Sequence, residues 1–205
     1  MKKVFQLEGG VYQILSKMAD LLLINLLVIL FSIPIITMGS AISAAFHLLM
    51  DTEEGAGAKI VSTFYHYFKQ HFKSSTLLFL GSLAIFGVIV LLVRATLQTP
   101  FQFLSLLLAA FMLILMMNLL TTVAYKQLTL KEIVTTAISV SMKYTGLFCL
   151  SLTSLLLSLL VPIFLPKLMF LWFFFSFSLP LFIQTKIYLA CMARFNTQYF
   201  PKGEE

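Results

Sequence analysis

The chain alternates between long uncharged stretches and short charged ones. Uncharged runs of 20, 31, 23 and 18 residues follow Lys73, Arg94, Lys143 and Lys167, in that order. A helix needs about 20 mostly apolar residues to cross a hydrocarbon core about 30 Å thick, and backbone inside lipid must satisfy its own hydrogen bonds. These runs therefore predict four long transmembrane helices. The predicted helices are Ser75–Leu97, Phe101–Tyr125, Tyr144–Leu165 and Leu168–Ala190.

The first uncharged run is too long for one ordinary crossing. It has 30 residues between Asp20 and Asp51, which as one helix would extend about 45 Å. Pro34 lies near its middle and lacks a backbone donor, so we expect the helix to break there. The result is a Pro-broken pair, with one helix over Lys17–Ile33 and a short one over Gly39–Met50. The second helix is either re-entrant or crosses a locally thinned bilayer.

Basic residues predict the orientation, because they accumulate on the cytoplasmic side of a membrane. If the chain reverses at Pro34, 12 of the 14 basic residues lie on one side, and only Arg94 and Lys167 lie on the other. A single crossing by residues 20–50 gives 9 against 5. We therefore predict a multi-pass plasma-membrane protein with both termini in the cytoplasm.

The same topology predicts one membrane domain, residues 1–205, built from successive modules. These are the N-terminal helix pair (1–50), a cytoplasmic loop with an amphipathic helix (51–73), a helical hairpin (74–125), a cytoplasmic amphipathic segment (126–143), a second hairpin (144–192) and a cytoplasmic tail (193–205). The two hairpins have similar lengths. This fits an internal duplication of the kind found in transporters, or the usual length of any membrane helix pair.

Composition supports an all-α polytopic membrane bundle. Apolar types make up 60% of the chain and charged types 11%, against about 25% charged residues in soluble domains. A soluble protein of this size cannot bury so much apolar side chain, because small domains keep a large surface. The net charge of +6 is expected on the cytoplasmic rim, where it attracts anionic lipids, and we expect no nucleic-acid partner.

Sequence signatures of catalysis are missing. The chain has no phosphate loop, paired-histidine metal motif, C-x-x-C or G-x-S-x-G. No acidic or basic residue lies clearly at the middle of a long predicted crossing, where proton-coupled transporters need one. We therefore expect no enzyme activity, no catalytic residue, no cofactor and no metal site.

Polar side chains within the predicted spans have two interpretations. Asn118, Thr122 and Tyr125 form a stripe at helical spacing, which either lines a polar path or joins neighbouring helices. Asn25 lies in the first predicted helix and should face the bundle, because a buried amide needs a partner. Pro180 is expected to kink the last predicted helix.

An aromatic and basic stretch precedes the first long span. Its members are Phe64, Phe68, Lys69, Phe72 and Lys73. We predict that Ile60–Lys73 forms an amphipathic helix on the cytoplasmic face and that this stripe is a docking surface. His47 is the histidine nearest membrane depth, and we expect it to be interfacial.

One stretch of the chain contains a specific sequence pattern in addition to its apolar character. Residues 25–41 contain an Asn, an apolar run, the pattern S-x-P-x-x-T-x-G and then small residues; the members are Asn25, Ser32, Pro34, Thr37 and Gly39. This resembles the N-terminal signature of the YesL-like family of bacterial membrane proteins, and residues 64–73 look like that family's aromatic-basic segment. The family often has Trp where this chain has Val28, and Pro where it has Ser40.

The resemblance suggests a physiological role but no particular chemical activity. The YesL-like family is of uncharacterised function, and its members are often encoded beside carbohydrate-uptake and carbohydrate-degradation genes. An accessory or regulatory role in carbohydrate uptake follows from it, with membrane lipids and either a sugar permease complex or a second copy as partners. The alternative is a small transporter or channel subunit acting as an oligomer, with a polar path lined by Asn25, Thr37, Asn118 and Thr122.

Overall fold

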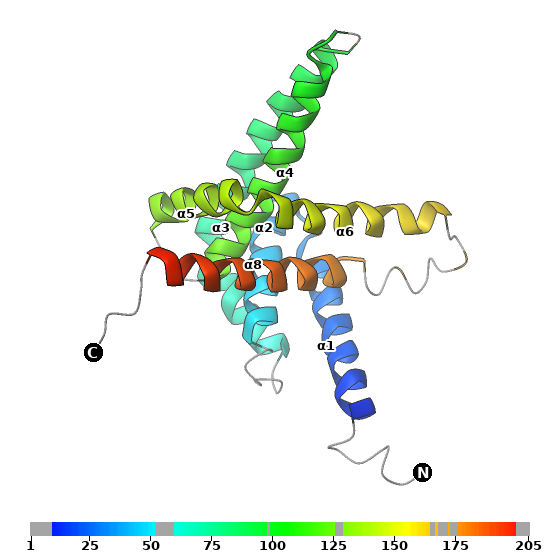
Figure 1. The fold of residues 1–205 in the computed structure, drawn as a ribbon. Coiled ribbons are helices and arrows are strands. Elements are labelled where there is room, and N and C mark those ends of the chain that lie inside the picture. The colour runs from blue at the N-terminus through cyan, green and yellow to red at the C-terminus, as the bar shows by residue number, and fades with distance from the viewer. Residues whose placement is uncertain are drawn as a thin grey trace.

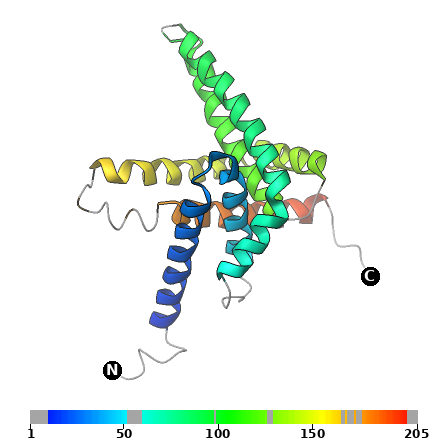
Figure 2. The ribbon, with the colours of Figure 1, turned by 180° about the vertical axis from the view of Figure 1, so that it is seen from behind.

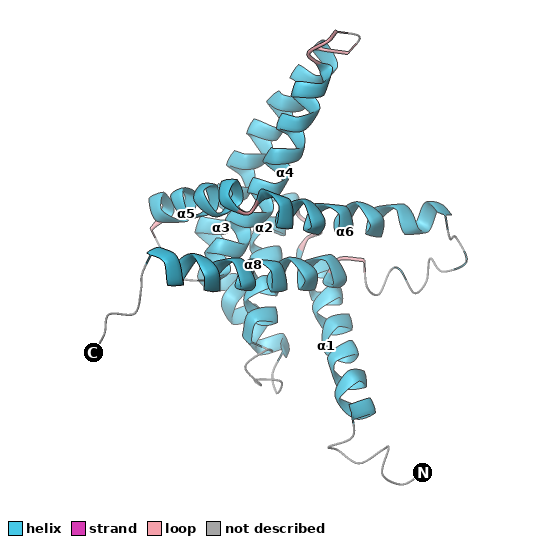
Figure 3. Cartoon of the chain, in the orientation of Figure 1, coloured by secondary structure: helices cyan, strands magenta, loops and turns pink. Residues whose placement is uncertain are grey.

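The computed structural model describes residues 10–51, 60–97, 99–125, 129–164, 167, 172 and 176–199. Within these residues the chain is helical and contains no strand (Figure 3). The helices are α1 (Gly10–Phe31), α2 (Ile35–Asp51), α3 (Ile60–Ala95), α4 (Gln102–Tyr125), α5 (Leu130–Lys143), α6 (Thr145–Phe164) and α8 (Ser178–Tyr199). The predicted all-α class is confirmed.

The predicted break around Pro34 is present. Helix α1 ends at Phe31 and α2 begins at Ile35, so the proline precedes the first turn of α2, where its missing N–H costs nothing. The second helix begins four residues before the predicted Gly39, and Thr37 and Gly39 therefore lie inside the helix.

Helix α3 differs from its prediction, because it joins two expected elements. The amphipathic segment Ile60–Lys73 and the span from Ser75 form one helix of 36 residues, about 54 Å long at 1.5 Å per residue. No proline interrupts residues 60–95, so the backbone hydrogen bonds continue through the change from polar to apolar sequence. The apolar stretch from Ser75 onward is long enough to cross a membrane, and the polar half extends beyond it.

Among the described residues, α3 and α4 are each long and apolar enough to cross a membrane, and the bent pair α5–α6 would make a third such span. The axes of α5 and α6 meet at 93°. Helix α5 begins with a capping box, in which the Thr129 side chain accepts from the Glu132 N–H and the Glu132 carboxylate accepts from the Thr129 N–H. The count of four transmembrane helices stays a prediction.

The last predicted span, Leu168–Ala190, starts in residues that lie mostly outside the described part of the chain. Its described portion is α8, which begins only at Ser178. Pro180 consequently lies in the first turn of α8, where no intrahelical N–H bond is required. The predicted mid-helix kink at Pro180 is wrong for this reason.

Helix α2 forms the centre of the fold. It packs against α1, α3, α4 and α8, and its residues Gly39–Phe46 are buried. Helices α3 and α4 form an antiparallel hairpin, and the upper part of this hairpin projects beyond the other helices (Figure 1). The hairpin of α6 and α8 runs across it in both views (Figures 1 and 2).

Candidate functional site

Four helices meet at a buried network of amides and hydroxyls. Asn118 of α4 donates from Nδ2 to Ser141 Oγ of α5 at 2.7 Å. Gln184 of α8 donates from Nε2 to Asn118 Oδ1 at 2.8 Å, and the Ser151 hydroxyl of α6 donates to Gln184 Oε1. All four side chains are buried. The network therefore joins α4, α5, α6 and α8 through side-chain hydrogen bonds.

Thr122 extends this network by one helical turn. Its hydroxyl donates to the Asn118 carbonyl at 2.7 Å and lies 2.8 Å from the Tyr188 hydroxyl. The Tyr125 ring meets the Tyr188 ring edge-on, with centroids 5.8 Å apart. The polar stripe of α4 thus faces α8, and each of its polar groups contacts another polar group or an aromatic ring.

Sequence reasoning did not single out Gln184, Ser141 or Tyr188. One signal was available for the first of these, since Gln184 is the one amide in an otherwise mostly apolar predicted span. Spacing alone does not pair it with Asn118, because the two residues are 66 positions apart.

The chemistry of the network is that of neutral hydrogen bonding. Amides and aliphatic hydroxyls do not ionise near neutral pH, and Asn118 uses both its oxygen and its nitrogen on protein partners. An unpaired polar group in an apolar interior costs several kcal/mol, whereas a paired one does not. The arrangement is therefore suited to holding helices together.

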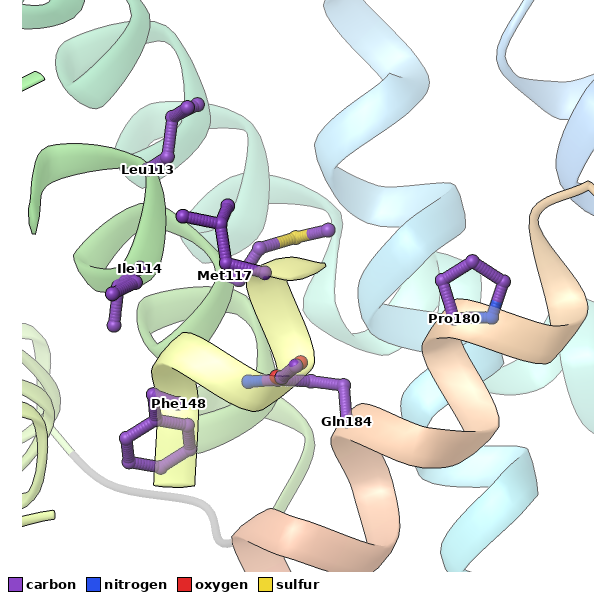
Figure 4. A pocket seen from close by; sticks show the side chains of 8 residues that line it. Leu113, Ile114, Met117, Phe148, Pro180 and Gln184 are labelled. Atoms are coloured by element: carbon purple, nitrogen blue, oxygen red, sulfur yellow. The ribbon is translucent and has the colours of Figure 1, made fainter. Parts of the chain in front are cut away.

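A small pocket lies beside Gln184 and Ser151. Its volume is about 10 Å³, the room needed by about one water molecule. Six apolar side chains complete its wall: Leu113, Ile114, Met117, Phe148, Leu152 and Pro180. Figure 4 shows α4 side chains on one side of the pocket, with Gln184 and Pro180 of α8 on the other. The pocket is too small for a sugar.

Thr37 and Gly39 determine how α2 is connected and packed. The Thr37 hydroxyl donates to the carbonyl of Phe31 at 2.6 Å and to that of Pro34 at 2.8 Å, which bridges the ends of α1 and α2. At Gly39 an added Cβ would lie 2.4 Å from the Phe79 Cβ. Because Gly39 has only a hydrogen atom in place of a side chain, α2 can approach α3 closely at this point. The Ser40 hydroxyl adds a hydrogen bond to the Thr76 hydroxyl of α3 at 2.9 Å.

Asn25 caps a helix that is distant in the sequence. Its Oδ1 accepts from the backbone N–H of Phe177 at 3.0 Å and of Ser178 at 3.2 Å. These groups lie at the start of α8, where backbone N–H groups have no intrahelical acceptor. Asn25 is buried and, as predicted, faces the bundle.

The four residues proposed to line a polar path occupy three separate places. Asn25 caps α8, Thr37 bonds to carbonyls at the Pro34 break, and Asn118 and Thr122 belong to the buried network. Each makes structural hydrogen bonds at its own place. Of the four residues that were expected to line a polar path, only Asn118 and Thr122 lie together.

The predicted docking surface needs a correction. Phe64 is fully buried and packs 5.5 Å from the Phe31 ring, and Phe68 packs 4.9 Å from the same ring. The end of α1 therefore covers the phenylalanine stripe, with Phe72 partly buried beside Phe68. The neighbouring stripe of α3, one position further around the helix, is exposed and consists of Tyr65, Lys69 and Lys73. The Tyr65 ring still lies 6.5 Å from the Phe31 ring, and the Lys69 Nζ lies 5.8 Å from the Tyr65 ring centroid.

These features define an all-helical membrane protein whose interior is tied together by buried polar bonds. Residues 21–92 match the family described as protein of unknown function, DUF624. The match runs from α1 through the Pro34 break and α2 into α3, and it leaves out the network around Asn118 and Gln184. No curated protein and no solved structure matches the chain.

Proposed function

We propose that the protein is a non-enzymatic integral membrane protein that acts by assembling with other membrane proteins, in an accessory or regulatory role in carbohydrate uptake. The observation that carries this proposal is the buried network, in which Asn118, Gln184 and their partners bond to one another. The adjoining pocket admits about one water molecule. Since these buried polar groups are engaged with one another, we expect the protein to act through its surface.

The carbohydrate role rests on the resemblance to the YesL-like family. YesL-like proteins belong to DUF624, and the match over residues 21–92 supports that resemblance. The proposed location is the plasma membrane, with both termini cytoplasmic, and the proposed partner is a sugar permease complex or a second copy of the chain.

The exposed face of α3 is the proposed contact surface. Tyr65, Lys69 and Lys73 lie on it, at the polar end of the helix and just before the apolar stretch. Helix α3 contains no acidic residue, so this face is positively charged and suits an acidic surface on the partner.

Affinity purification from native membranes in a mild detergent tests the proposal. We expect subunits of a sugar permease, or its ATPase, to copurify with the protein. The double variant Lys69→Glu/Lys73→Glu should lower their recovery several-fold, because it reverses the charge of the contact surface. Lys131→Glu is the matched control, since Lys131 is also exposed but lies on α5. Equal recovery with both variants would contradict the proposed surface.

The second candidate function is a small transporter or channel subunit acting as an oligomer. The observation in its favour is the presence of Asn118, Thr122 and Gln184 together inside an apolar bundle. Proteoliposomes containing the purified protein test it by uptake of labelled sugars. Uptake that Asn118→Leu abolishes would favour transport over assembly, and uptake equal to that of empty liposomes would reject transport.

A further inference from the structure

All three histidines of the sequence lie together where α2 ends and α3 begins. The His47 ring stacks on the Tyr67 ring with centroids 3.5 Å apart, and the His71 ring lies 5.7 Å from that of His47. His66 meets Tyr67 edge-on at 5.5 Å. The Tyr67 hydroxyl donates to Asp51 at 2.8 Å. We call these five residues the histidine cluster.

Two imidazole nitrogens of the cluster are buried and make no hydrogen bond to the described residues. His71 is only 7% exposed, and within the described part of the chain its Nε2 has no hydrogen-bond partner. His47 Nδ1 is likewise without a hydrogen bond there and lies 3.7 Å from the Asp51 carboxylate. Buried polar groups in proteins nearly always have partners, so two nitrogens without a partner in one cluster point to a place where a proton can bind.

The histidine cluster contains three imidazole rings but only one carboxylate. Proton uptake by His71 adds a positive charge beside two further imidazoles, those of His47 and His66, and the one carboxylate of the cluster is that of Asp51. That carboxylate is shared with the Tyr67 hydroxyl. Among the described residues, the groups whose charge acts on His71 are His47 from α2 and His66 from α3, and none comes from α1, α4 or α8.

His71 is the member of the cluster whose protonation is most strongly disfavoured in the folded protein. It lies four residues before the apolar stretch of α3 that begins at Ser75, and burial lowers its pKa from 6.5 to about 4, with further lowering by His47 and His66. Between pH 6.5 and pH 4, His71 is therefore mainly protonated in the unfolded chain and mainly neutral in the folded chain. The contribution of neutral, buried His71 to the free energy of unfolding is fully present above pH 6.5 and is lost as the pH falls toward 4.

We propose that the histidine cluster is a proton-binding site, and that proton uptake from water loosens the contact between α2 and α3. The cluster lies at one end of this contact, next to Asp51, the last residue of α2. The other end is held by the close approach at Gly39 and by the Ser40–Thr76 hydrogen bond. Charging His71 separates the two helices at the Asp51 end and leaves the Gly39 end packed.

Histidine-selective NMR of the protein in detergent micelles tests the binding step directly, because only three ring signals have to be assigned. At pH 5 an ordinary histidine is almost fully protonated. We expect the His71 signal still to be mainly that of a neutral ring at pH 5 and to become cationic only as the pH approaches 4. A His71 ring that titrates like a free histidine would overturn the proposal without any variant.

Hydrogen exchange tests the loosening step. After correction for the intrinsic pH dependence of exchange, we expect the amides at the Asp51 end of α2 to lose protection at least tenfold between pH 7 and pH 4. His71→Phe keeps an aromatic ring but binds no proton, and it should abolish this loss. His66→Gln, at an exposed position of the same helix, should retain most of it. Protection that stays constant in the wild type, or that falls equally in His71→Phe, would refute the mechanism.

Discussion

Gly39→Ala is the sharpest test of how α2 packs against α3. The added Cβ would lie 2.4 Å from the Cβ of Phe79, 2.8 Å from its Cγ and 2.9 Å from the Ser75 carbonyl oxygen. Ordinary van der Waals contact begins at 3.4 Å, so the helices must separate by about 3.4 − 2.4 = 1.0 Å at this point. Rotation of the Phe79 side chain cannot relieve the contact, because its Cβ and the Ser75 carbonyl move only with the backbone.

Two opposing terms determine the magnitude. Overpacking a dense interior costs about 1–3 kcal/mol, and more where the backbone must move. Replacing glycine by alanine inside a helix returns about 1 kcal/mol through helix propensity. Since this contact involves backbone on both helices, we expect a net loss of about 2 kcal/mol, which corresponds to a fall of about 4–8 °C in Tm for a chain of this size.

Thermal unfolding in detergent, followed with a thiol-reactive dye, measures the effect. The assay uses a Cys149→Ser background, because Cys149 is an exposed free cysteine that would react before unfolding. Cys191 is fully buried, so it becomes reactive only when the bundle opens. Gly81→Ala and Gly87→Ala are matched controls, because a Cβ at either position meets no atom within 4 Å. Both controls should unfold at the wild-type temperature or slightly above it. The packing argument is refuted if Gly39→Ala unfolds at the same temperature as these controls.

Three further predictions concern the buried polar groups and the topology. Asn25→Leu should lower the stability by about 1–3 kcal/mol in the same assay, because two backbone N–H groups at the start of α8 lose their acceptor; an unchanged Tm would exclude the capping role. Asn118→Leu and Gln184→Leu should each cost about 1–3 kcal/mol, whereas the double variant should cost less than their sum, since each single variant leaves the other amide without its partner and the double variant does not; strict additivity would show that the two amides act independently. In a background without the native cysteines, Thr37→Cys should react with an impermeant thiol reagent from outside the cell and Glu54→Cys only from inside; labelling of both from the same side would contradict the predicted reversal at Pro34.

The sequence by itself determined the class of the protein and the bounds of its clearest helices. The predicted span Phe101–Tyr125 corresponds to α4 at Gln102–Tyr125, and the span predicted to end at Leu97 ends at Ala95. These features are local: apolar length sets whether a helix can cross a membrane, and a proline breaks the helix in which it stands. The break at Pro34 was predictable for the same reason.

Only the tertiary structure decided which residues meet. Residue types and helical spacing showed that Asn25 and Asn118 need partners, but the partners lie on α8, far along the chain. The same holds for Phe64, which a stripe of aromatics and lysines marked as surface and which the end of α1 covers. The rotation of each helix about its axis and the crossing of the two hairpins are set by packing between helices, and a one-dimensional pattern does not contain that information.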